Sequence, residues 1–266
     1  MIRSPAVAGS FYPASPEALE KTVEDLLGPA RGDRRVRAVV APHAGYVYSG
    51  RIAGEVYAGV HVPDLCVVLC PNHTGAGARR SLDADETWRT PLGDVPVDEA
   101  LTRALVGRAG LVKDTRAHAR EHALEVHLPF LQRKNPRVRI VPLCLGGIGA
   151  DACIEIGAAI ADAVAHAGAE VLVIASTDMS HYIPADEAAK LDRMALDRVE
   201  ALDAPGLYRT VADNDITMCG FIPTTTVIAA AKALGADRAE LVRYGHSGEM
   251  SGDFDHVVGY AGLVIP

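Results

Sequence analysis

Four short segments of this chain each end a hydrophobic run with a side chain that can bind a metal or move a proton. They carry His43, His73, the pair Asp178 and His181, and Cys219. Imidazole and thiolate groups bind transition metals, and a carboxylate near an imidazole can support proton transfer. The residue types therefore predict a metal site or an acid–base site, provided that the fold brings the four segments together.

Hydrophobic patterning predicts how the segments meet. Residues 36–41, 65–70 and 171–175 are largely apolar at successive positions and rich in Val, Ile and Leu. Such runs are typical of strands buried on both faces of a parallel sheet. The loops that follow parallel strands gather along one edge of the sheet, where ligands bind in open α/β folds. We therefore expect His43, His73 and the Asp178/His181 segment to lie close together.

The two histidines that follow strands share one local pattern. His43 stands between Pro42 and Ala44, and His73 follows Pro71 after one residue. Each chain segment must turn directly after its strand, which presents the imidazole at the sheet edge. The alternative for each is a loop histidine that bonds only to backbone carbonyls. Two such histidines at the ends of successive strands favour metal ligation.

Asp178 and His181 are three residues apart in the segment STDMSHY. In a turn, this spacing allows the carboxylate to orient the imidazole as a catalytic acid or base. The alternative is an aspartate that caps the turn beside a histidine that covers it. We expect these two residues to be catalytic.

Cys219 differs from the other cysteines because it precedes Gly220 and a helix predicted from Pro223 to Leu234. The positive end of a helix dipole stabilises a thiolate, which is a good ligand for soft metals. The alternative is a small residue in a tight turn. The other cysteines in apolar runs are interpreted as small buried hydrophobic residues: Cys66, Cys70 and Cys144.

Two further segments carry candidate pocket residues. The segment EHALEVH contains Glu121, His122, Glu125 and His127, but its spacing is neither HExxH nor HxxEH, which excludes a zinc-peptidase motif. One of these four side chains is expected to point into the pocket. The Gly-rich segment 245–255 lacks the spacing of a phosphate-binding loop, so we interpret it as a pocket rim that carries His246.

Composition narrows the class of protein. The chain has 266 residues, of which 49% are hydrophobic and 23% charged, and no linker or repeat divides it. We expect one domain over residues 1–266. The net charge of −8 without a basic stripe argues against nucleic-acid binding. No apolar stretch has the length of a membrane span or a signal peptide, and five cysteines suggest reduced thiols, so we expect a cytoplasmic protein with no membrane partner.

The predicted elements alternate between strands and helices. Helices are expected at 16–27, 50–58, 98–108, 119–134 with an interruption at Pro129, 150–168, 185–202 and 223–234. Further strands are expected at 137–147, 240–249 and 256–266, and residues 81–98 are expected to form an extended excursion or hairpin. This order predicts an α/β fold with a central, largely parallel or mixed sheet flanked by helices.

Several of these motifs together resemble the MEMO family. They are RSPAVAGSFYP, APHAGYVYSG, the PNH turn, WRTPLGDVPVD, EHALEVHLPFL, STDMSHY, MCG and VVGYAGLVI, and they run in order along nearly the whole chain. Bacterial and archaeal members are called component B of the AmmeMemoRadiSam system. The resemblance implies a fold similar to the class III extradiol dioxygenases (LigB-like) and suggests AMMECR1-like and radical-SAM proteins as pathway partners.

The resemblance also implies a ligand set. His43 and His73 match the metal-binding histidines of the family, Cys219 matches its cysteine ligand, and His181 with Asp178 matches the acid–base position. The implied metal is iron(II) or copper(I), with zinc as a further option. Because a soft thiolate replaces the carboxylate of the dioxygenases, dioxygenase activity is not inherited with the fold.

Two hypotheses about function follow. The first is a metal-dependent redox enzyme that acts on a small organic molecule. The second is a binding module, either a metal-handling protein or a scaffold that recognises a peptide in the same pocket. A pocket that reads phosphate would contain arginine beside the histidines. The four motif segments contain none, which favours a metal over a phosphopeptide.

Overall fold

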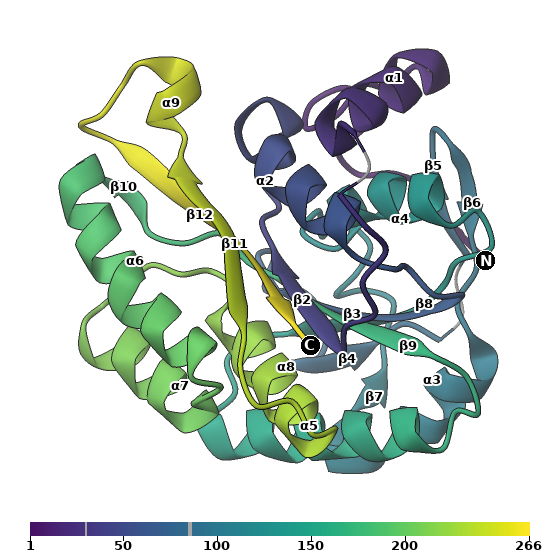
Figure 1. The fold of residues 1–266 in the computed structure, drawn as a ribbon. Helices are drawn as coiled ribbons and strands as arrows, with labels where there is room; N and C mark the ends of the chain where they lie inside the picture. Colours follow the sequence, from purple (N-terminus) through teal and green to yellow (C-terminus); the bar gives the residue numbers. More distant parts are fainter. Residues whose placement is uncertain (30, 85–86) are drawn as a thin grey trace.

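The computed structural model describes residues 1–29, 31–84 and 87–266 and shows a mixed sheet of nine strands among them. Four parallel strands form its centre in the order β2 (Ala38–Ala41), β9 (Val171–Ser176), β3 (Leu65–Pro71) and β8 (Arg139–Leu145) (Figure 1). Every residue of β2, β3 and β9 is buried. These strands therefore have the continuous apolar runs that the sequence showed.

The sheet is extended on both sides of this centre. On one side, β12 (Val257–Ile265) runs antiparallel to β2 and also pairs with β10 (His181–Ile183) and β11 (Glu240–His246). On the other side lie β4 (Arg80–Leu82) and β7 (Val112–Lys113). A separate small sheet contains β1 (Ile2–Arg3), β5 (Thr87–Thr90) and β6 (Gly93–Val95).

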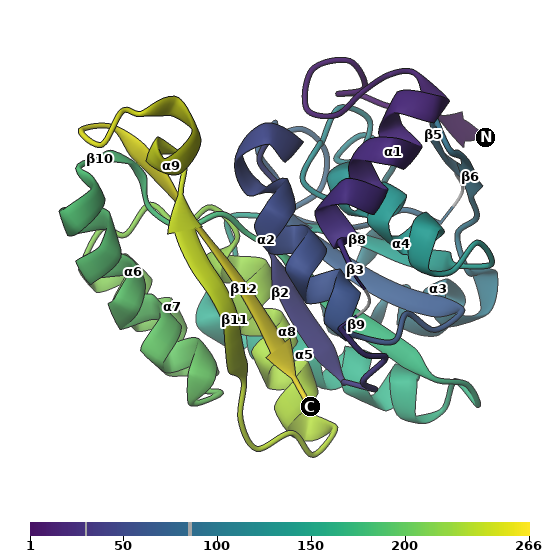
Figure 2. The ribbon, with the colours of Figure 1, turned by 45° about the horizontal axis from the view of Figure 1, so that its top comes forward.

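Helices cover both faces of the large sheet (Figures 1 and 2). One face packs against α1 (Pro16–Leu27), α2 (Tyr46–Gly59) and α4 (Leu128–Lys134). The other packs against α3 (Glu99–Leu105), α5 (Ala150–Ala165), α6 (Ala185–Glu200), α7 (Ala204–Asp213) and α8 (Phe221–Ala233). The predicted α/β class, with a mixed sheet between helices, is confirmed.

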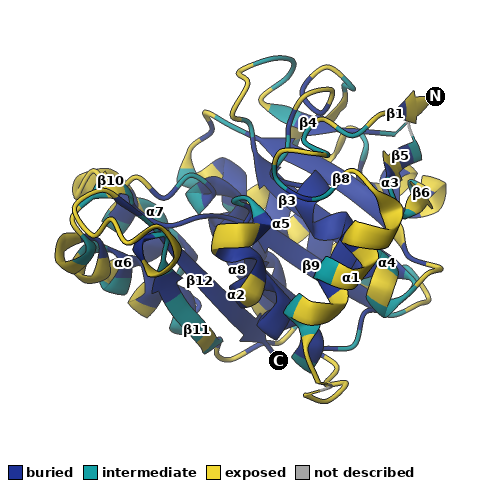
Figure 3. Ribbon diagram, turned by 90° about the horizontal axis from the view of Figure 1, so that it is seen from above, coloured by how far each residue is buried: buried dark blue, intermediate teal, exposed yellow. Residues whose placement is uncertain are grey.

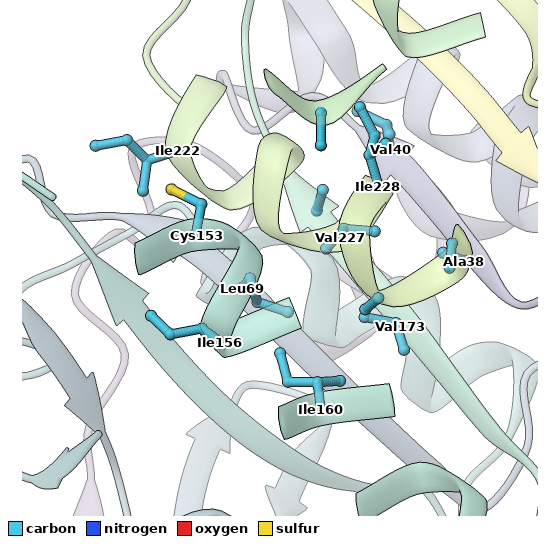
Figure 4. Close-up of a cluster of buried hydrophobic side chains, with 14 of the residues drawn as sticks. Ala38, Val40, Leu69, Cys153, Ile156, Ile160, Val173, Ile222, Val227 and Ile228 are labelled. Atoms are coloured by element: carbon cyan, nitrogen blue, oxygen red, sulfur yellow. The ribbon is translucent and has the colours of Figure 1, made fainter. Parts of the chain in front are cut away.

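The two hydrophobic cores follow from the alternation of side chains along each strand. In β2, Ala38 and Val40 face the core beneath α5 and α8, whereas Val39 and Ala41 face the core beneath α2. Figure 4 shows the first core, in which α5 and α8 pack against the sheet. Figure 3 shows that the central strands are buried, while exposed residues lie on the outer helices and loops.

Local signals explain where the best-predicted helix begins and ends. The Ser15 side chain accepts a hydrogen bond from the backbone N–H of Ala18, and Pro16 occupies the first turn of α1. Gly28 ends the helix with a positive φ of 60°, which glycine adopts without the steric cost that a Cβ would bring. The observed bounds of α1 equal the predicted ones.

The predicted helix over residues 119–134 is wrong in its first half. Residues 116–120 form turns, the 3₁₀ turn η2 (Glu125–His127) follows, and α4 begins only at Leu128. Pro129 lies in the first turn of α4, where its missing N–H costs no hydrogen bond, so it starts the helix instead of interrupting it.

Other bounds differ less. The helix expected at 50–58 begins at Tyr46, and α7 was not predicted. The short helix α9 (Gly248–Ser251) lies in the segment interpreted as a loop. The excursion at 81–98 contains β4 and the antiparallel pair of β5 and β6, with residues 85–86 outside the described part. Among the described residues, no helix has the length and apolar character needed to cross a membrane.

A buried ion pair connects the start of the chain with residues 118–125, which precede α4. Arg3 Nη1 lies 2.7 Å from Glu125 Oε2, and the same guanidinium donates to the backbone carbonyls of His118 and Glu121. Glu125 also accepts a hydrogen bond from the Tyr12 hydroxyl. Since residues 116–124 contain no regular helix, these contacts define their path.

We expect Arg3→Met to destabilise the protein strongly, because it leaves the buried Glu125 carboxylate without its partner. Loss of one partner of a buried pair typically costs about 3–5 kcal/mol. Urea unfolding would measure this change. Arg137→Met is the matched control, since its pair with Asp64 is exposed and should contribute little. Equal stability of the two variants would contradict the role of Arg3.

Candidate functional site

Three histidines from different segments meet at the carboxyl edge of the central strands. His43 follows β2, His73 follows β3, and His122 lies in the segment before η2. The ring centroids are 5.2 Å apart for His43 and His73 and 4.8 Å apart for His73 and His122. One ligand atom of each imidazole lies within 4.8 Å of the others. This cluster is the strongest candidate for a metal site in the described residues.

The cluster lies in the wall of a cavity of about 700 Å³. Asp178 and His181 line the same cavity, together with four aromatic residues: Phe11, Tyr48, Tyr182 and Tyr260. The α9 segment contributes Ser251 and Asp253 to the rim. The cavity therefore joins polar groups that can hold a metal to aromatic walls that can hold an organic molecule.

His43 is buried and held on three sides. Its backbone N–H donates to Asp178 Oδ1 over 2.8 Å, and its Nδ1 lies 2.7 Å from Ser176 Oγ. Its Nε2 lies 3.3 Å from Cys219 Sγ. Burial and then the neighbouring histidines lower the pKa of His43, so the imidazole is neutral and able to bind a metal.

His73 is held by the buried carboxylate of Glu121. Its Nδ1 lies 2.8 Å from Glu121 Oε1, and its backbone N–H donates to Oε2 over 2.7 Å. Burial opposes the charged imidazole, but the hydrogen bond and charge of Glu121 outweigh it and raise the pKa of His73. His122 Nδ1 lies 3.5 Å from the same carboxylate, and burial lowers the pKa of His122.

Asp178 and His181 line one cavity but have different hydrogen-bond partners. Asp178 accepts the His43 N–H, and burial raises the pKa of Asp178 to about 7. The His181 backbone N–H donates to Thr217 Oγ1, and His181 Nδ1 lies 2.9 Å from the Thr217 carbonyl oxygen. Burial lowers the pKa of His181. The Asp178 carboxyl can therefore hold or release a proton near neutral pH.

Cys219 lies directly before the first residues of α8, with Gly220 pressed against β9. A Cβ at Gly220 would lie 2.2 Å from the Ser176 carbonyl oxygen, so only glycine allows this approach. The Cys219 sulfur accepts the backbone N–H of Asp178 over 3.3 Å. Burial and the Asp178 charge raise the pKa of Cys219, so the expected thiolate at the helix end is a thiol here.

A family model described as Memo-like protein matches residues 3–264 of this chain. The chain belongs to the Memo family. It is 43% identical to a MEMO1 family protein of Methanothermobacter thermautotrophicus, over 99% of this chain and 100% of that protein. It is 44% identical to a MEMO1 family protein of Methanosarcina barkeri, again over 99% and 100% of the two chains.

A solved structure shows the same fold for a more distant protein. An uncharacterized protein from Escherichia coli K12 superposes on this Memo chain with a TM-score of 0.58 and 16% identity. The match covers 85% of this chain and 99% of that one. At this identity the likeness supports the fold alone.

Four predicted pocket residues of the Memo chain lie outside the main cavity: Glu121, Glu125, His127 and His246. Glu125 is buried against Arg3, and His127 is buried between Ser176 and Tyr57. His246 lines an adjoining cavity of about 760 Å³ that shares Phe11 and Tyr48 with the first. Of the four candidates in EHALEVH, only His122 lines the main cavity, while Glu121 supports His73 from behind.

Sequence reasoning missed Ser176, the aromatic wall residues and Thr217. Ser176 is the last residue of a buried apolar strand, and a polar residue at this position was the available signal. The aromatic residues come from four separate segments, and only a three-dimensional structure groups them.

We expect Glu121→Gln to lower the pKa of His73 in this Memo protein. The variant removes the negative charge that stabilises the protonated imidazole, so the proton dissociates at lower pH. An NMR pH titration of the His73 ring would measure the shift. Glu24→Gln is the control, because Glu24 pairs with Arg133 on the surface. An unchanged His73 titration in the Glu121 variant would contradict this account.

Proposed function

We propose that this Memo-family protein binds a redox-active metal ion, iron(II) or copper(I), and acts as an oxidoreductase on a small organic substrate. The proposal rests mainly on the arrangement of His43 and His73. Each has its Nδ1 engaged, by Ser176 and by Glu121, which leaves Nε2 available to a metal. Histidine ligands in proteins are usually oriented in this way by a partner on the second nitrogen.

Cys219 is proposed as the third ligand from its distance to His43 alone, since the ligand atoms within 4.8 Å of one another in the described residues belong to His43, His73 and His122. Two atoms bound to one ion at about 2.1 Å for nitrogen and about 2.3 Å for sulfur lie roughly 3.1–3.6 Å apart at bond angles of about 90–110°. The distance between Cys219 Sγ and His43 Nε2 is 3.3 Å. His122, whose ligand atom lies within 4.8 Å of those of His43 and His73, can complete the set.

The donor set favours a soft metal over magnesium or calcium. Imidazole and thiolate ligands prefer copper(I), iron(II) and zinc, whereas hard cations prefer oxygen. Bound here, iron or copper would supply one-electron chemistry. The protein's own residues supply the rest: Asp178 can hold a proton beside His43, His181 can exchange one at the cavity wall, and the aromatic rings exclude water from an organic substrate.

Binding without catalysis is the second candidate. The adjoining cavity is lined by Arg51 and Arg243, so a longer acidic ligand such as a peptide could extend from one cavity into the other. However, both arginines already pair with Glu55, which offsets their charge. The histidine cluster therefore favours a metal ion over an acidic peptide as the ligand of this site.

Anaerobic titration with Fe(II), and separately with Cu(I), tests the site. We expect the wild type to bind one equivalent with a metal-to-sulfur charge-transfer band. His43→Ala and Cys219→Ser should each weaken binding by at least about 100-fold, because each removes a ligand. Cys153→Ser, which changes a buried cysteine in α5, is the matched control.

Two outcomes would revise the proposal. If neither metal binds the wild type more tightly than the His43 variant, the protein is not a metalloenzyme at this site. If Cys219→Ser binds like the wild type and His122→Ala does not, the third ligand is His122 and the site contains three histidines.

Metal affinity should rise with pH. Because the pKa of Cys219 is raised, the metal must displace the thiol proton, so the Kd should fall about tenfold per pH unit while the free thiol stays protonated. Measurements at about pH 7.5 and about pH 8.5 would show this slope. The Cys219→Ser variant should release one proton fewer on metal binding, so its Kd should depend less steeply on pH. An equal slope in both proteins would argue against a sulfur ligand.

A further inference from the structure

A second cavity, of about 760 Å³, adjoins the cavity that contains the histidine cluster. It is lined by residues of α1 and α2 and, opposite them, of β11, α9 and β12 (Figure 2). The two cavities have five lining residues in common: Ser10, Phe11, Val47, Tyr48 and Tyr260. Because these residues belong to both walls, one ligand that passes over them can occupy both cavities.

The walls of the second cavity are mainly apolar and aromatic. Leu26 of α1, Ile52 of α2 and Met250 of α9 line it. Val47, which lies where the two cavities meet, is 62% exposed, and Met250 is 60% exposed. Exposed apolar side chains that gather around a hollow are typical of a binding site. These walls favour a ligand with apolar surface.

The arginine and glutamate side chains at this cavity neutralise one another. Arg51 and Arg243 lie 3.4 Å and 3.1 Å from Glu55 Oε1, and Arg243 also lies 3.7 Å from Glu249 Oε2. Arg31, a further partner of Glu55, does not line the cavity, and its half-exposed side chain is screened by solvent. Two guanidinium groups are thus balanced by two carboxylates, so an uncharged ligand fits better than an ion that needs a counter-charge.

Close contact between α1 and α2 determines the shape of the second cavity. A Cβ at Gly50 would lie 2.8 Å from Leu26 Cδ1, so the glycine leaves the room that this leucine occupies. At Gly54, a Cβ would clash with the backbone carbonyl of Leu26, so only glycine lets the helices approach this closely. Ile52 is 4% exposed. A cavity that is already formed binds a ligand at a low cost in side-chain entropy.

Phe11 connects the second cavity with the histidine cluster. Its ring centroid lies 4.8 Å from that of His122. Its backbone carbonyl accepts the N–H of Tyr46 over 2.8 Å, which holds Phe11 at the start of α2. A ligand that contacts Phe11 in the second cavity therefore lies beside a ring that packs on a histidine of the first.

We propose that the second cavity is a subsite for an uncharged, apolar part of the substrate, whose polar end lies at the histidine cluster. The substrate class is then an elongated organic molecule with a polar head and an apolar body. This inference deepens the proposed function and rests on it, because the same substrate occupies both cavities.

Simple alcohols test the subsite without any metal. Three probes differ only in chain length: 1-butanol, 1-hexanol and 1-octanol. Two further probes retain the chain of 1-octanol: octane-1,8-diol replaces its apolar end by a hydroxyl, and octanedioate carries a carboxylate at each end. NMR titration of the full-length protein without added metal gives each Kd. The methyl signals of Leu26, Ile52 and Met250 and the ring signals of His122 locate the probe.

We expect the affinity to rise about three- to fourfold for each added methylene, as burial of a methylene typically produces. The diol should bind at least about fivefold more weakly than 1-octanol, because it buries a hydroxyl without a partner. Octanedioate should also bind more weakly. Saturation with 1-octanol should shift the methyl signals of the subsite and the ring signals of His122 together.

A variant that fills the subsite provides a second test. Thr22 lines the second cavity from α1, and Thr22→Trp places a large ring there. It should remove most of the affinity that 1-octanol gains over 1-butanol. Lys21→Trp is the matched control, because Lys21 is exposed on the same helix and does not line the cavity. If Thr22→Trp does not fold, the methyl signals of the wild type decide.

Three results would overturn the proposal. The first is a 1-octanol affinity within about twofold of that of 1-butanol, since burial of four methylenes has a much larger effect. The second is tighter binding of octanedioate than of 1-octanol, which would assign the cavity to acidic ligands. The third is a shift of the subsite methyl signals without a shift of His122, which would make the two cavities separate sites. A wild type that binds no Fe(II) refutes the proposed function separately, because the alcohols are measured without metal.

Discussion

The position of β9 between β2 and β3 is the constraint on which the candidate site depends. The three strands are parallel, so their carboxyl ends lie side by side and the residues that follow them share one small volume. Ser176 ends the middle strand and reaches His43 on one side and His127 behind it. A different strand order would separate these groups, which are hydrogen-bonded to one another here.

Much of this arrangement could be predicted from the sequence, because strands that are buried on both faces consist of continuous runs of apolar residues. The bounds of β3 and β9 differ from prediction by only one residue, and those of α1 agree. The region around residues 119–124 could not be predicted, because it has no periodic pattern of its own. Its path depends on Arg3, which is more than a hundred residues away in the chain.

For the site, sequence could identify residue types at strand ends but not the atoms that they present. His43 and His73 were expected to meet, and they lie beside each other. The roles of Glu121 and Glu125 could not be separated from spacing, since one carboxylate holds a cavity histidine and the other holds an arginine. The thiol state of Cys219 was also missed, because burial opposes the helix dipole and only packing reveals burial.

The contacts of Arg3 have a consequence for how the pocket could change over evolution or design. The segment that carries Glu121 and His122 takes its shape from an arginine in the first strand, and Phe11 from the same end of the chain packs on the His122 ring. Substitutions in the first twelve residues could therefore reshape the cavity and retune its histidines while every residue that faces a ligand from the central strands stays the same. The amino-terminal segment can therefore change the shape of the site without any change in the residues that follow the central strands.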